Sequence, residues 1–200
     1  MTGRSRRTQA ERSEQMRARL AQAAYEVIAE RGHSAFRTAA VVAHAGVSQG
    51  ALLHHFPTKE AMTLAAIDHA LARAYAASME RIAAAGRDRQ AVLHAMIEDF
   101  RDFFSGDRFW VALDITMDGA KDASISPAIR EIVKRSRQPV YDAWADRLIA
   151  CGGSGAWSRE VVRMTSALIS GHAIRTLWAD DGESLDDALK RWLDALPDRP

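Results

Sequence analysis

The chain has 200 residues, of which 48% are hydrophobic and 26% charged, a globular composition that suffices for a sizeable core. No apolar run approaches the ~20 residues of a transmembrane helix, and no apolar stretch follows the basic N-terminus, so neither a membrane protein nor a secretory signal is expected. The single cysteine, Cys151, excludes an internal disulfide and fits a cytoplasmic location.

The charge is distributed unevenly along the chain. Residues 1–59 carry nine Lys and Arg against four Asp and Glu, a net charge of +5, which leaves −4 for the remaining 141 residues. A basic N-terminal region on an acidic body indicates contact with a polyanion, although a solubilising tail would explain the same pattern equally well.

The spacing of apolar residues predicts an all-α protein, because they recur at intervals of three and four and strand-like alternation is absent. Pro139 is expected to kink or break the helix that contains it. In chain order, the predicted helices cover about 13–31, 38–45, 48–55, 58–86, 92–105, 107–118, 127–150, 158–178 and a last segment that begins at the cap residue Ser184.

Residues 38–55 read as two short helices joined by a tight turn at Gly46, which is a helix-turn-helix unit. Such a unit can place its second helix in the major groove of DNA. Gln49 could pair with adenine, and Ala51 or Leu53 could touch a thymine methyl group. Ser48 and the free amides at the helix start could hold a phosphate.

The segment TAAVVAHAGVSQGALLHHFPTKEAM, residues 38–62, resembles the DNA-binding head of the TetR family of transcriptional repressors. The Ala-Gly-Val-Ser turn, Gly50, the His55-Phe56 pair and Lys59-Glu60 all fall at the family's spacing, and the close resemblance covers about residues 12–65. The chain departs from the family at Leu53, where tyrosine is usual. Leucine cannot donate the hydrogen bond that this tyrosine commonly makes to DNA.

The resemblance implies an N-terminal three-helix DNA-binding domain, residues 1–60, and a ligand-sensing and dimerisation domain, residues 61–200. The resemblance and the expected position of the second helix in the major groove together predict the DNA contacts Thr38, Ser48, Gln49, Gly50, Ala51, Leu53, His54, His55 and Lys59. It further implies a homodimer in which helices 127–150 and 158–178 of each chain form a four-helix bundle. The predicted interface residues are Trp144, Leu148, Leu168, Gly171 and Arg175.

A ligand cavity in the second domain is also expected from the resemblance, although each aromatic residue there, taken by itself, is better explained as part of a packed core. A lining of this kind favours a small apolar or aromatic effector. The predicted pocket residues are Phe100, Phe104, Trp110, Met117, Trp144 and His172.

Signatures of other functions are missing from the sequence. It contains no phosphate-binding Gly-rich loop, no His-Glu-x-x-His and no nucleophile elbow, so neither an enzyme nor a cofactor is predicted. His54 and His55 have no further metal ligands at suitable spacing, so no metal site is predicted.

The predicted function is that of a homodimeric repressor that binds a palindromic operator in double-stranded DNA and is released by a small molecule. A constitutive or activating regulator without ligand control remains an alternative. So does an all-helical adaptor or enzyme that merely contains a helix-turn-helix.

Overall fold

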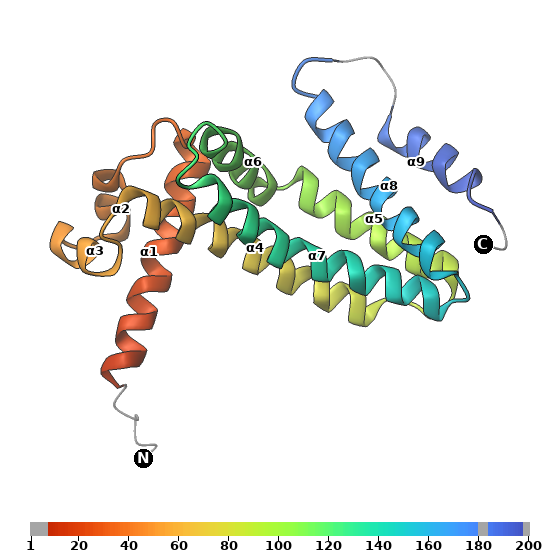
Figure 1. The fold of residues 1–200 in the computed structure, drawn as a ribbon, viewed down its shortest axis with the longest axis horizontal. Helices are drawn as coiled ribbons and strands as arrows, with labels where there is room; N and C mark the ends of the chain where they lie inside the picture. The colour runs from red at the N-terminus through yellow and green to blue at the C-terminus, as the bar shows by residue number, and fades with distance from the viewer. Residues whose placement is uncertain (1–7, 180–183, 198–200) are drawn as a thin grey trace. The chain divides into compact units, whose positions relative to one another are not determined.

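The structure, a computed structural model, describes residues 8–179 and 184–197, and this part of the chain is helical without any strand (Figure 1). The predicted all-α fold is therefore confirmed. The nine helices of the described residues are α1 (Gln9–Arg31), α2 (Thr38–Ala45), α3 (Gln49–His55), α4 (Lys59–Ala84), α5 (Arg89–Ser105), α6 (Asp107–Gly119), α7 (Ser126–Ala150), α8 (Gly155–Arg175) and α9 (Leu185–Asp194).

Hydrogen bonds to capping side chains explain why two helices begin earlier than predicted. Thr8 and Glu11 form a capping box, in which each side chain accepts a hydrogen bond from the other residue's backbone N–H, so α1 begins before Ser13. The Ser154 side chain caps α8, so this helix begins at Gly155 and not at residue 158 as predicted. The predicted cap Ser184 is confirmed, since its hydroxyl accepts the N–H of Asp187. The Thr58 hydroxyl caps α4 in the same way by accepting the N–H of Ala61.

Helix α7 continues through Pro139, so the predicted break is wrong. Proline leaves the carbonyl of Arg135 without its intrahelical donor, which costs roughly 3 kcal/mol in a helix interior. Pro139 is exposed, whereas Val140, Trp144 and Leu148 on the same helix are buried. Burying such side chains contributes about 1.5–3 kcal/mol each, which outweighs the cost of the proline.

The chain divides into two compact units, the first comprising residues 1–72 and 110–133 and the second residues 73–109 and 134–200. In the first unit, α1 packs against α2, and one stripe of α1 is buried. The larger buried side chains of this unit include Leu20, Val27, Ile28, Phe36, Val41, Leu52, Phe56, Met62, Ile67, Leu71, Ile115 and Ile129.

A hydrogen-bonded histidine, His33, links the segment between α1 and α2 to two helices of the first unit. The Nδ1 atom of His33 lies 2.7 Å from a carboxylate oxygen of Asp118, and its Nε2 atom lies 3.2 Å from the Thr63 hydroxyl. The backbone N–H of His33 donates to Asp114 at 2.6 Å. The hydrogen bond from His33 lowers the pKa of Asp118, so this carboxylate is ionised near neutral pH. The segment between α1 and α2 is thereby tied to α4 and α6.

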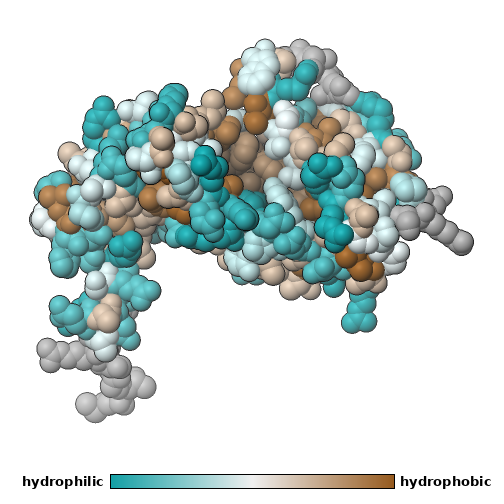
Figure 2. All heavy atoms as spheres, in the orientation of Figure 1, coloured by the Kyte–Doolittle hydropathy of each residue, from teal (hydrophilic) through white to brown (hydrophobic). Residues whose placement is uncertain are grey.

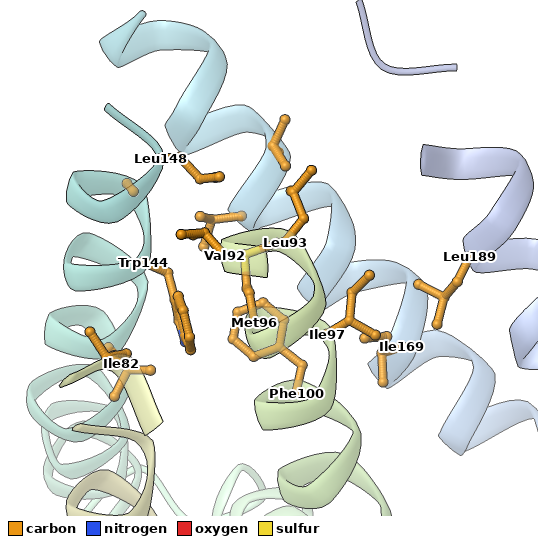
Figure 3. Packing of buried hydrophobic residues seen from close by; sticks show 14 of the residues in the cluster. Ile82, Val92, Leu93, Met96, Ile97, Phe100, Trp144, Leu148, Ile169 and Leu189 are labelled. Atoms are coloured by element: carbon orange, nitrogen blue, oxygen red, sulfur yellow. The ribbon is translucent and has the colours of Figure 1, made fainter. Parts of the chain in front are cut away.

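The second unit is built around a core to which α5, α7, α8 and α9 all contribute (Figure 3). Trp144 of α7 is fully buried, and Figure 3 shows its ring between Ile82 and the Val92 and Met96 side chains of α5. Its indole N–H donates to the buried carboxylate of Asp99 at 2.9 Å. On the other side of α5, Ile97 lies near Ile169 and Leu189.

Over the described residues, none of the helices is both long and apolar enough to cross a membrane.

Candidate nucleic-acid interface

Gly46 makes the turn between α2 and α3 possible. Its φ of 62° lies in the left-handed region, where a side chain would be strained, and it ends α2 as the C-cap. The N–H of Val47 donates to the carbonyl of Val42, and the Arg19 side chain of α1 donates to the carbonyl of Ala45. The terminal carbonyls of α2 are thus satisfied, and the turn is held against α1.

Helix α3 is fixed on one face and exposed on the other. Leu52 is fully buried, and Phe56, which follows the helix, is almost fully buried. The Ser48 hydroxyl accepts the N–H of Ala51 at 3.1 Å and so sets the start of the helix. The exposed face carries Gln49, Gly50, Leu53 and His54, with Ala51 partly buried beside them.

The start of α3 is exposed and carries little side-chain bulk. A Cβ atom added to Gly50 would meet only the Ser48 hydroxyl, at 4.0 Å, so packing does not require glycine at this position. The missing side chain instead leaves the backbone of the first turn uncovered, where a duplex could approach closely. Gln49, the first residue of the helix, projects from that same turn.

The end of α3 is anchored by an arginine from α1. Arg17 donates to the carbonyl of His55 at 3.2 Å, and its guanidinium carbon lies 4.7 Å from the centre of the Phe56 ring. Burial lowers the pKa of His55 below its ordinary value of 6.5, and the charges of His54 and Arg17 act in the same direction. The lowered pKa favours the neutral form of His55, which can still donate a hydrogen bond to a phosphate.

Two further predicted contacts lie at helix starts. Thr38 is the first residue of α2 and Lys59 the first residue of α4, and both are partly buried. The Lys59 ammonium lies 5.8 Å from the centre of the Phe36 ring. This contact holds the aliphatic part of the lysine side chain in place while the charged end stays at the surface. The nine predicted DNA-contact residues thus all lie in the first unit, on or beside the helix-turn-helix.

The N-terminal turns of α1 carry mainly hydrophilic side chains (Figure 2). Farther along α1, the hydrogen bond from Gln22 lowers the pKa of Glu26, as does His44 of α2, whose Nε2 atom lies 2.8 Å from the carboxylate. This pair fixes α2 on α1. The basic residues Arg4, Arg6 and Arg7 lie outside the described residues.

The residues predicted for a ligand pocket are distributed over both units. Phe100, Phe104 and Trp144 are buried in the core of the second unit, where His172 is partly buried. The other two residues, Trp110 and Met117, belong to the first unit, and Met117 is 63% exposed. Among the residues described, a groove of about 800 Å³ lies between α5 and α9, and none of the six lines it.

The predicted dimer residues also separate into two groups. Trp144 and Leu148 are at most 1% exposed and pack in the core of their own chain, so they do not face a partner, and this part of the prediction needs correction. Leu168 is partly buried, and Gly171 and Arg175 are exposed on α8. The apolar stripe of α7 indicated a buried face, but its spacing does not reveal which helices cover it.

One functional candidate was missed in the sequence. Arg137 of α7 is 5% exposed, and none of its guanidinium nitrogens has a hydrogen-bond partner among the described residues. Its side chain lies over the rings of Phe103 and Tyr141. The arginine stands four residues before Tyr141 on α7, a spacing that places both on one helix face, and this was the only local signal.

Comparison with known proteins agrees with the helix-turn-helix. The family model described as "Bacterial regulatory proteins, tetR family" matches residues 20–66, which include α2, α3 and the start of α4. The HTH-type transcriptional regulator CymR of Pseudomonas putida is 32% identical over 194 residues, which are 97% of this chain and 95% of CymR. An uncharacterised HTH-type regulator of Mycobacterium tuberculosis is 29% identical over 68% of this chain and 70% of its own.

Solved structures share the fold at lower identity. A putative transcriptional regulator from Saccharomonospora viridis, crystallised with choline, is 20% identical with a TM-score of 0.69, over 90% of this chain and 95% of its own. The multidrug binding protein EbrR, in complex with imidazole, is 19% identical with a TM-score of 0.63, over 98% of both chains. Because the family model matches and the alignment with CymR covers nearly the whole of both chains, the chain belongs to the tetR family of bacterial regulatory proteins and is a DNA-binding transcriptional regulator.

Proposed function

We propose that the protein is a homodimeric repressor of the bacterial cytoplasm that binds a palindromic operator through α3 and leaves it when a small molecule binds its second unit. The observation that carries the proposal is the exposed first turn of α3, a helix whose opposite face is anchored by the buried Leu52. A helix held in this way can present Gln49 to base edges without losing its orientation.

The exposed face of α8 supports dimerisation. Met164, Ala167, Gly171 and Arg175 recur at intervals of three and four, and all four are exposed. A Cβ atom added at Gly171 would meet nothing within 4 Å, so the surface around it is open in the single chain. Small residues on such a face would allow the same helix of a second chain to approach closely, as a two-fold interface requires.

Ligand control is supported by the links between α6 and the segment that precedes α2. Asp114 and Asp118 of α6 both bond to His33, so a displacement of α6 would move the start of the helix-turn-helix. The fold is shared with a putative transcriptional regulator crystallised with choline and with a multidrug binding protein crystallised with imidazole. If a ligand favours a different packing of the second unit and α6 is displaced as a result, the spacing of the two α3 helices would change.

Selection of random duplex DNA by the purified protein at near-physiological salt would test this function. We expect enrichment of a palindrome whose half-sites lie about one helical turn, roughly 34–36 Å, apart. A single enriched half-site would contradict the dimer, and salt-sensitive binding without any motif would contradict sequence-specific recognition.

Replacing Gln49 with alanine is expected to relax the sequence preference at one base pair of each half-site, at a cost of roughly 1–3 kcal/mol for the preferred base. Gln49 is exposed, so the fold should not change. Competition binding against operators varied at each position would measure the effect. An unchanged preference at every position would show that Gln49 does not read a base.

Replacing Lys59 with alanine should weaken binding to all sequences alike, because a phosphate contact carries no base information. The slope of log K against log salt should fall by about one. Binding isotherms at several salt concentrations would measure it, with Lys190→Ala, exposed on α9, as the matched control. Equal slopes in the two variants would mean that Lys59 does not touch phosphate.

A further inference from the structure

Arg137 places a positive charge inside the second unit, and no described residue forms a hydrogen bond with it. Its Nε, Nη1 and Nη2 atoms are all buried, and none has a hydrogen-bond partner among the described residues. Arginine stays protonated in proteins, so burial cannot neutralise it as it can a lysine or a histidine. A buried cation of this kind is strongly unfavourable unless an anion joins it.

The immediate neighbours of Arg137 stabilise its charge only in part. The guanidinium carbon lies 3.9 Å from the centre of the Phe103 ring and 5.4 Å from that of Tyr141. Aromatic faces attract a cation, but they do not replace the hydrogen bonds that its five N–H groups make in water. The N–H groups of Arg137 therefore remain available to an acceptor.

Two polar groups on the same helices as the aromatic neighbours of Arg137 form hydrogen bonds to other residues. Asp99 lies one turn before Phe103 on α5, but its carboxylate accepts the indole N–H of Trp144 at 2.9 Å. The Tyr141 hydroxyl accepts from Ser166 of α8 at 3.1 Å. Neither group bonds to Arg137, whose three guanidinium nitrogens have no hydrogen-bond partner among the described residues, and this points to a group from outside the chain.

We propose that Arg137 binds the carboxylate of a small aromatic acid, and that this acid is the effector; the inference rests on the ligand control proposed above. The planar guanidinium matches a carboxylate in a bidentate pair, and one carboxylate balances its single charge. A phosphate carries a charge of about −1.5 to −2 and would leave excess negative charge among apolar groups. The rings of Phe100, Phe104 and Phe109 form edge-to-face contacts next to Phe103, which suits an aromatic body.

The burial of Arg137 also explains how such a ligand would act as a switch. Because the guanidinium is closed off from solvent, a carboxylate reaches it only if the side chains that cover it move. The ligand therefore binds better to a rearranged packing of the unit than to the one seen here. A difference in affinity between two packings is what shifts the population from one to the other.

Three acid and amide pairs would test this site: benzoate with benzamide, phenylacetate with phenylacetamide, and 2-naphthoate with 2-naphthamide. Each pair differs in charge but hardly in shape. Calorimetric titration would compare the full-length wild type with Arg137→Met, Arg137→Lys and the control Arg135→Met, an exposed arginine on the same helix. Release of the selected operator would be measured with the same compounds.

We expect at least one acid to bind the wild type and Arg135→Met about ten times more tightly than its amide, and Arg137→Met to lose this preference. Arg137→Lys keeps the positive charge but cannot form a bidentate pair, so it should retain only part of the preference for the acid. Arg137→Met should also melt no lower than the wild type without ligand, since it removes an unpaired buried charge. A purely structural arginine would instead leave the preference intact and lower the melting temperature.

Equal binding of acids and amides, or no binding of any acid, would overturn the assignment of Arg137. Release of the operator by an amide would then still support ligand control. Conversely, an acid that binds through Arg137 but leaves the operator occupied would support the anion site and contradict release by a ligand. The two proposals therefore fail in different measurements.

Discussion

Replacing Trp144 with alanine should lower the free energy of unfolding by about 4–8 kcal/mol. The side chain is 0% exposed and packs against α5 in the core of the second unit. Removing a buried tryptophan leaves a cavity and typically costs 3–5 kcal/mol. The substitution also deprives the buried Asp99 of its indole donor, which adds about 1–3 kcal/mol. Urea denaturation followed by circular dichroism would measure the change, read from the midpoint at constant slope.

Two matched variants separate the causes of this loss. Trp178→Ala removes the same side chain from a position that is 70% exposed, and it should change stability by no more than about 0.5 kcal/mol. Trp144→Phe keeps most of the ring but removes the N–H, so its cost should approach that of the unpaired carboxylate alone, about 1–3 kcal/mol. If Trp144→Ala cost as little as Trp178→Ala, the indole would not be part of a packed core.

The existence and order of the helices were predictable from the sequence because these features are encoded locally. The period of the apolar residues, the glycine at 46 and the caps at Thr58 and Ser184 all act within one or two turns. The predictions were wrong where packing between segments distant in the sequence decided the structure. Pro139 disfavours a helix locally, yet the buried residues that follow it on α7 keep the helix continuous.

The candidate sites divide in the same way. The helix-turn-helix was predictable, since its turn, its cap and its exposed face lie within about 20 residues of chain. Trp144 and Leu148 were assigned to an interface because spacing shows that a face is apolar, but not whether its own chain or a partner covers it. Arg137 was overlooked because the Phe103 ring that covers it comes from α5, more than 30 residues earlier.

A bulky charged residue in place of Gly171 should abolish the dimer without unfolding the chain. In Gly171→Arg, the new side chain starts from an open position on α8, where an added Cβ atom would meet nothing within 4 Å in the single chain. Loss of glycine from a helix interior should in fact stabilise α8 by up to about 1 kcal/mol. In a two-fold interface every substitution occurs twice, so two guanidinium groups would face each other near the axis. Sedimentation equilibrium at micromolar concentration should find a monomer.

Gly171→Ala is the control that distinguishes loss of the interface from a change in the helix. It gains the same helix propensity but adds only a methyl group, so it should remain a dimer and bind the operator like the wild type. Gly171→Arg should bind the operator roughly 10²–10⁴-fold more weakly, because each head must then find its half-site alone. Its thermal unfolding should stay cooperative, and its affinity for a single half-site should be unchanged. If Gly171→Arg sediments as a dimer, the chains associate through another surface, and α8 has no part in spacing the two heads.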